Sequence, residues 1–242
     1  MQVVFRDSVA KVQGALVDDL CSLLIDNRDK PLLLFYAGGS GLQVFPKLFD
    51  WIKSIGSMES KIWFAPNDER FDVTASNFRA LQTLDCYKGF EELGVQFIDV
   101  LTHGKTLTAC AYWYNEWVRA VMDQVHMGDG KVISIIGMGA DGHTAGIFPY
   151  PENEIFFEGE FINTNRYVTG YDVADKNQYR ERITLTVPAL KVIDHYFAYV
   201  VDDAKKPALN RVLRKEGSIA ATPALLWNDL NPLTVYTTIS LQ

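Results

Sequence analysis

Short runs of consecutive apolar residues alternate with longer segments of helical period along most of this chain. Strands that are apolar at consecutive positions are typical of a parallel sheet covered by helices on both faces. Six such runs predict strands: Leu32–Tyr36, Ile62–Ala65, Val95–Val100, Val132–Ile136, Ile183–Val187 and Tyr196–Val201. The sequence therefore predicts an open, mainly parallel, twisted α/β sheet flanked by helices. In this Rossmann-like architecture, function belongs to the loops beyond the carboxyl ends of the strands.

The helical segments support the same architecture. From Leu107 to Val125, apolar and aromatic residues recur every three or four positions, which predicts an amphipathic helix whose aromatic stripe packs into the core. Weaker helical patterns cover residues 8–25, 43–55 and 204–214. No repeat or linker interrupts the 242 residues, so one domain spanning residues 1–242 is expected.

Charge and composition exclude several classes of function. The chain has 23 basic and 30 acidic residues and a formal net charge of −7, so general binding to nucleic acid or an anionic membrane is not expected. No apolar run is long enough to cross a membrane. The 3 cysteines form no paired motif, and no targeting segment is evident, so reduced thiols and a cytoplasmic location are expected.

Two polar clusters follow predicted strands. Gly38, Gly39 and Ser40 come directly after the first run, where glycines let main-chain N–H groups approach a ligand closely; the turn suits a phosphate, or it is an ordinary tight turn. Asn67-Asp68-Glu69-Arg70 follows the second run. It is either a solvated turn or part of a charged site.

The segment Gly137-Met138-Gly139-Ala140-Asp141-Gly142-His143-Thr144 follows the central run. Its glycines match GxGxxG, but Pro149 prevents the long helix that a dinucleotide-binding turn must open. An aspartate and a histidine two positions apart in a glycine-bounded loop suit a general base with its electrostatic partner. The alternative is a histidine with a purely structural role.

Other catalytic motifs are missing from the sequence. His103-Gly104-Lys105-Thr106 resembles the end of a Walker A loop, but Asp99 stands where the first glycine should be. No serine lies in a GxSxG elbow, and no histidine has the spacing of a zinc ligand. Neither a metal nor a cofactor is expected.

Four segments in this order resemble the 6-phosphogluconolactonase family, which shares a NagB-type fold with the glucosamine-6-phosphate deaminases. They are Ala37-Gly38-Gly39-Ser40, Asp68-Glu69-Arg70 with Ser76-Asn77, Gly137 to Ala145 with Phe148-Pro149, and Arg182-Ile183-Thr184-Leu185-Thr186. The resemblance implies hydrolysis of 6-phospho-D-glucono-1,5-lactone, a small sugar-phosphate substrate, by a monomer or weak homo-oligomer.

The resemblance also implies roles for individual residues. His143 would deprotonate the attacking water, and Asp141 would help to orient or tune His143. Substrate contacts are expected from Gly38, Gly39, Ser40, Asp68, Arg70, Asn77, Gly139, Thr144, Arg182 and Lys205. How the cations divide between the phosphate and the carbonyl group stays open.

Three loops depart from the family pattern, at residues 41–43, 71–75 and 176–179. A glucosamine-6-phosphate deaminase is one alternative, but Phe148 occupies the place of that enzyme's assisting glutamate, and a phenyl ring cannot relay a proton. A non-catalytic sugar-phosphate-binding regulator is the other alternative. Such a regulator would need no general base, and therefore would not need His143.

Overall fold

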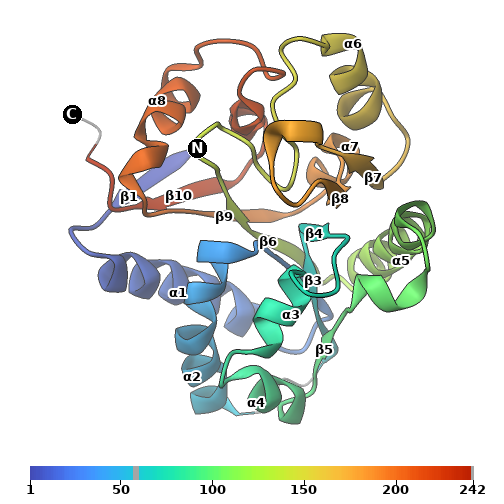
Figure 1. Cartoon of the computed structure of the whole chain (residues 1–242). Coiled ribbons are helices and arrows are strands. Elements are labelled where there is room, and N and C mark those ends of the chain that lie inside the picture. The colour runs from blue at the N-terminus through green and yellow to red at the C-terminus, as the bar shows by residue number, and fades with distance from the viewer. Residues whose placement is uncertain (57–59, 241–242) are drawn as a thin grey trace.

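A seven-stranded parallel sheet forms the centre of the computed structural model, which describes residues 1–56 and 60–240. The order of its strands is β1-β10-β9-β6-β2-β3-β5 (Figure 1). Their bounds are β1 Gln2–Phe5, β2 Leu32–Tyr36, β3 Ile62–Pro66, β5 Val95–Phe97, β6 Lys131–Gly137, β9 His195–Val200 and β10 Leu233–Thr237. The predicted α/β class with a mainly parallel sheet is confirmed.

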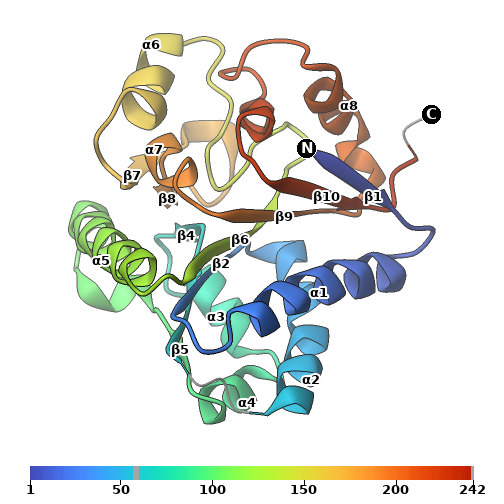
Figure 2. The same ribbon diagram turned by 180° about the vertical axis from the view of Figure 1, so that it is seen from behind.

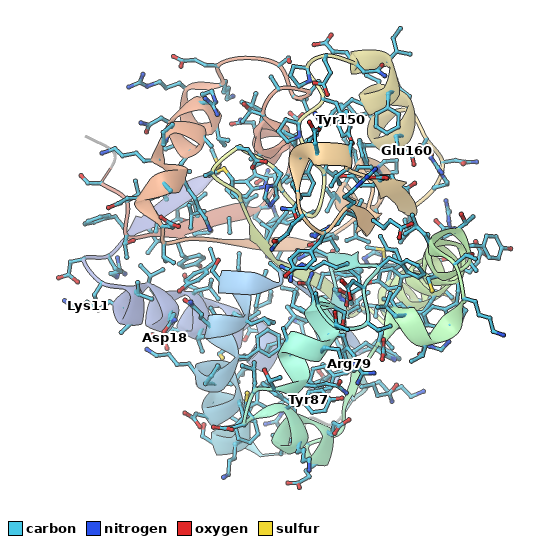
Figure 3. The ribbon with its side chains drawn as sticks, in the orientation of Figure 1. Lys11, Asp18, Arg79, Tyr87, Tyr150 and Glu160 are labelled. Carbon is cyan, nitrogen blue, oxygen red and sulfur yellow. The ribbon has the colours of Figure 1, made fainter. Side chains whose placement is uncertain are left out.

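Helices cover both faces of this sheet. One face carries α1 Val9–Asp26, α2 Phe45–Ile55, α3 Asn77–Gln82 and α4 Tyr87–Glu92; the other carries α5 Leu107–Met127, α7 Val187–Leu190 and α8 Lys206–Arg214 (Figure 1). The short α6, Glu154–Phe157, packs at the edge of the second group. Successive residues of β2 enter opposite cores, Leu33 one and Leu34 the other, which explains why the run is apolar at every position. Charged side chains such as Lys11 lie on the outer surface of α1 (Figure 3).

A second, three-stranded antiparallel sheet packs beside the first. It has the order β4-β8-β7, with β4 Asp68–Arg70, β7 Val168–Asp172 and β8 Glu181–Leu185. The prediction that Ile183–Val187 belongs with the parallel strands is therefore wrong. β8 pairs with the chain as it leaves β3, and its apolar side chains Ile183 and Leu185 fill the same core as α5.

The remaining sequence predictions differ from the structure mainly at boundaries. The helix expected near residue 43 begins at Phe45, after a 3₁₀ helix over Gly39–Val44. The expected strand Val95–Val100 ends at Phe97. The first and last strands of the chain, β1 at the sheet edge and β10 beside it, were not predicted; Figure 2 shows them side by side, and they pair in parallel.

The strand order reverses direction in the sheet between β2 and β6. From β2 the chain continues to β3 on one side, and from β6 it continues to β9 on the other. The loops after β2 and β6 diverge at such a point and leave a crevice at the carboxyl ends of the strands. Among the helices of the described residues, none is long and apolar enough to cross a membrane.

Candidate active site

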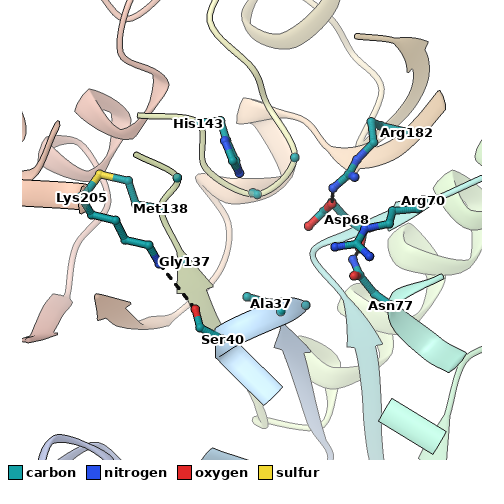
Figure 4. Close-up of a pocket in the computed structure, with 15 residues that line it drawn as sticks. Ala37, Ser40, Asp68, Arg70, Asn77, Gly137, Met138, His143, Arg182 and Lys205 are labelled. Atoms are coloured by element: carbon teal, nitrogen blue, oxygen red, sulfur yellow. Dashed lines mark hydrogen bonds and ion pairs between the residues drawn. The ribbon is translucent and has the colours of Figure 1, made fainter. Parts of the chain in front are cut away.

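A cleft of about 240 Å³ opens at this reversal point. Its lining combines the turns after β2 and β6, the β4–β8 pair, the first residue of α3 and the residue directly before α8 (Figure 4). The lining residues are Ala37, Gly38, Gly39, Ser40, Asp68, Arg70, Asn77, Gly137, Met138, Gly139, His143, Ala145, Gly146, Arg182 and Lys205. The structure thus brings together every site residue predicted from sequence except Asp141 and Thr144.

His143 and Asp141 form a hydrogen-bonded pair at the mouth of the cleft. His143 Nδ1 lies 2.6 Å from Asp141 Oδ1, which also accepts the His143 main-chain N–H at 3.1 Å. Burial would raise the pKa of Asp141, but the hydrogen bond and charge of His143 outweigh it and hold that pKa below its usual value. Because an ionised carboxylate only accepts, Nδ1 carries the proton, and in the neutral form of the ring Nε2 has a free lone pair.

The imidazole is held between a glycine and an aromatic ring. A Cβ atom at Gly139 would overlap both His143 and Asp141, so only glycine fits there. On the other side, the His143 and Phe148 rings stack with centroids 4.3 Å apart and planes 19° apart. No described residue hydrogen-bonds to Nε2, which leaves this atom to act on a molecule in the cleft.

The loop after β6 is fixed from behind. Thr144 is fully buried; its hydroxyl donates to the Gly137 carbonyl at 2.8 Å and accepts from Trp227 Nε1 at 3.0 Å. Thr144 is not among the residues that line the cleft, and its hydroxyl fixes the loop; its predicted substrate contact stays a prediction. The Tyr171 hydroxyl donates to the Gly146 carbonyl at 2.6 Å, which fixes the far end of the same loop.

The turn after β2 presents donors to the opposite side of the cleft. Gly39 has φ +57°, a conformation that favours glycine, and no described residue accepts from the main-chain N–H of Gly39 or Ser40. Lys205 reaches this turn from the segment before α8, with Nζ 3.5 Å from Ser40 Oγ. Burial lowers the pKa of Lys205, against a smaller opposing effect of Asp202, and no ion pair to Lys205 occurs among the described residues.

Two arginines face the cleft from the small sheet. Arg70 and Arg182 are direct cross-strand partners in the β4–β8 pair. Arg182 is 6% exposed and forms a buried ion pair with Asp68, which is 7% exposed. Arg70 instead donates to the Ala75 carbonyl at 3.0 Å. Two like charges placed opposite each other repel unless an anion compensates them, and Asp68 supplies one such anion.

Several site residues were missed by the sequence analysis. The guanidinium of Arg70 lies 4.4 Å from the centre of the Tyr179 ring, in the departing loop 176–179, so an aromatic support stands beside this cation. Glu69 is fully buried beneath the site, which excludes the solvated-turn interpretation of residues 67–70. No local signal identifies Glu69, because all three residues of β4 are charged and show no alternation of polar and apolar side chains.

No group of three or more histidine, cysteine or acidic side chains that could hold a metal ion occurs in residues 1–56 and 60–240. The cationic side chains that line the cleft are Arg70, Arg182 and Lys205.

A family model described as glucosamine-6-phosphate isomerases/6-phosphogluconolactonase matches residues 7–234. The chain belongs to this family. Among curated proteins, no sequence is a significant match.

Solved structures of the family have the same fold. A 6-phosphogluconolactonase from Plasmodium vivax is 20% identical, with a TM-score of 0.74 over 97% of this chain and 89% of that chain. A 6-phosphogluconolactonase from Thermotoga maritima is 23% identical, with a TM-score of 0.71 over 98% of both chains. A monomeric glucosamine-6-phosphate deaminase of the NagB superfamily is 14% identical, with a TM-score of 0.74 over 98% of this chain and 97% of that chain. The fold is thus common to both activities, and the choice between them depends on the site.

Proposed function

We propose that this protein hydrolyses 6-phospho-D-glucono-1,5-lactone to 6-phospho-D-gluconate. The observation that carries the proposal is the environment of His143. Its Nδ1 is bound to Asp141 and its ring is stacked on Phe148, so one basic nitrogen, Nε2, faces the cleft without a second acid beside it. This arrangement suits a reaction that needs one general base.

The proposed reaction uses that base twice. Nε2 takes a proton from water, and the water oxygen attacks the lactone carbonyl carbon to form a tetrahedral oxyanion. The bond from this carbon to the ring oxygen then breaks, and the imidazolium returns its proton to the leaving oxygen. Asp141 favours the imidazolium that forms between the two steps. All atoms balance with water as the only co-substrate.

The substrate phosphate is assigned to the side of the cleft formed by Ser40 and Lys205. Lys205 is a partly buried cation without an ion-pair partner among the described residues, and the N–H groups of Gly39 and Ser40 supply donors beside it. A phosphate with up to two negative charges would accept hydrogen bonds from all three donors, the Lys205 ammonium group and the two main-chain N–H groups.

The sugar ring and its carbonyl oxygen are then left to the arginine side. Asp68 compensates the charge of Arg182, and Arg70 donates to the Ala75 carbonyl, so this side offers guanidinium donors together with one carboxylate acceptor. Such a mixture suits hydroxyl groups and a developing oxyanion better than a dianion. In Figure 4, His143 lies between this group and Lys205.

A direct test measures lactone opening and deamination side by side. Purified protein should accelerate lactone hydrolysis well above its spontaneous rate, and should release no ammonia from glucosamine 6-phosphate. The deaminase alternative predicts the opposite result. Binding of 6-phosphogluconate without acceleration of either reaction would favour the non-catalytic regulator instead.

A further inference from the structure

Glu69 lies directly behind the charged side of the cleft. Side chains alternate along β4, so Asp68 and Arg70 face Arg182 while Glu69 points to the opposite face, the side of Ile183 on β8. Glu69 is 0% exposed, and it has no lysine or arginine partner within the described part of the chain. A buried carboxylate without a counter-ion is costly unless hydrogen bonds compensate it.

Main-chain amides supply that compensation. Glu69 Oε1 accepts from Arg70 N at 2.7 Å and from Asn77 N at 2.5 Å, and Oε2 accepts from Phe78 N at 2.9 Å. One carboxylate therefore joins β4 to the first turn of α3, and closes the segment 70–77 that connects them. Both ends of this segment carry a residue of the cleft, Arg70 and Asn77.

Asn77 extends this connection to the other side of the cleft. Its Nδ2 donates to the Asp68 carbonyl at 2.8 Å, and its amide lies so close to Gly38 that a Cβ atom on that glycine would overlap it. Asn77 is 1% exposed. Its side chain thus acts as a spacer between β4 and the glycine turn after β2.

We propose that Glu69 is a positioning residue, which acts through the main-chain amides of Arg70, Asn77 and Phe78. It holds the Arg70 guanidinium and the Asn77 amide in place, and through Asn77 it sets the separation of the two sides of the cleft. The expected effects on turnover and on 6-phosphogluconate binding rest on the proposed function, whereas the expected effect on amide exchange does not.

Burial raises the pKa of Glu69 to about 7, although the three amide hydrogen bonds oppose this shift. A neutral side chain is therefore compatible with this pocket, and Glu69→Gln removes the charge with little change in volume. Because an amide group presents a donor where one carboxylate oxygen accepted, at least one of the three main-chain amides loses its partner.

The test compares Glu69→Gln with Thr106→Ala, a matched control that removes a helix-capping side chain from α5, outside the cleft. In Glu69→Gln, the dissociation constant for 6-phosphogluconate and the KM for the lactone should rise about tenfold, the scale of one lost charge-assisted contact. The kcat should change by less than about threefold, because His143 is untouched. Amide hydrogen exchange at Asn77 and Phe78, in the first turn of α3, should accelerate more than in the strands of the parallel sheet. Thr106→Ala should leave all of these unchanged.

A double-mutant cycle with Asn77→Ala separates positioning from general destabilisation. If Glu69 acts through Asn77, adding Glu69→Gln to Asn77→Ala should change ligand binding by less than about twofold, whereas independent effects would multiply. Should Glu69→Gln fail to fold, Glu69→Asp keeps the charge on a shorter side chain and should show a smaller loss of binding in the same cycle.

Multiplying effects in the cycle, or unchanged exchange at Asn77 and Phe78, would overturn the positioning role. The exchange measurement needs no substrate. If the wild-type protein opens no lactone, the proposed function fails, while amide exchange still decides the role of Glu69.

Discussion

The two sides of the cleft are built from different kinds of sheet. One side consists of turns that leave the parallel sheet after β2, β6 and β9, and it offers main-chain N–H groups, one lysine and the proposed base His143. The other side consists of the antiparallel pair β4–β8, and it offers two arginines and the carboxylate of Asp68. The first side has one lysine without a carboxylate partner among the described residues, whereas on the second side the single carboxylate is paired with Arg182 and Arg70 keeps its charge uncompensated. We infer that the two sides have different tasks, with phosphate binding and proton transfer on the first and sugar contacts on the second.

The largest effect is expected from the base on the parallel side. His143→Ala should lower the kcat of lactone opening by about 10²–10⁴-fold, the usual contribution of a general base, with little change in 6-phosphogluconate binding. Steady-state kinetics corrected for spontaneous hydrolysis measures this. His103→Ala is the control, since that exposed ring stacks on Trp113 outside the cleft. Near-normal turnover in His143→Ala would remove the base from the mechanism.

On the antiparallel side, the largest effect should be on stability. Asp68→Asn leaves the buried Arg182 guanidinium without its counter-ion, and loss of one partner of a buried pair costs about 3–5 kcal/mol. Urea unfolding measures this free energy. Asp7→Asn, which breaks an exposed pair with Lys11 on α1, should leave the unfolding curve unchanged. If Asp68→Asn also left the free energy of unfolding unchanged, Asp68 and Arg182 would not be coupled.

Comparing the two kinds of cation sharpens the division of tasks. Lys205→Ala should remove about 1.5–3 kcal/mol of the preference for phosphorylated over unphosphorylated gluconolactone, the scale of a charge-assisted contact. Arg182→Lys should weaken the reaction of both substrates to a similar degree, because the planar fork is lost on the sugar side. The ratio of the two kcat/KM values is the measurement. A preference lost in Arg182→Lys and kept in Lys205→Ala would reverse the assignment.

The smallest effect is expected from metal removal. In the proposed mechanism the base acts on water directly, so treatment with EDTA should leave the lactonase rate unchanged. Activity lost with EDTA and restored by a divalent ion would contradict this mechanism.

The two sides also differ in how far the sequence predicts them. The parallel side follows from local signals: apolar runs such as Leu32–Tyr36 predict buried strands, and the glycines after them predict turns open to a ligand. The antiparallel side depends on pairing between segments more than 100 residues apart, as in the Asp68–Arg182 pair. A three-residue strand is too short to show its alternation, so the burial of Glu69 was not predictable.

Thr144 shows the same limit within a well-predicted motif. The motif placed it beside the base, but its hydroxyl is occupied by the Gly137 carbonyl and by Trp227. The indole comes from a segment 83 residues later in the chain, and nothing local to the motif indicates that contact. The positions of main-chain turns were predictable, whereas the direction of a single hydroxyl group depended on the completed fold.

A crystal structure with 6-phosphogluconate bound tests the division of the cleft most directly. The account predicts that the phosphate contacts Lys205 Nζ and the main-chain N–H groups of Gly39 and Ser40, and that the carboxylate carbon lies near His143 Nε2. A phosphate held by Arg70 and Arg182, with the carboxylate directed toward Lys205, would contradict it.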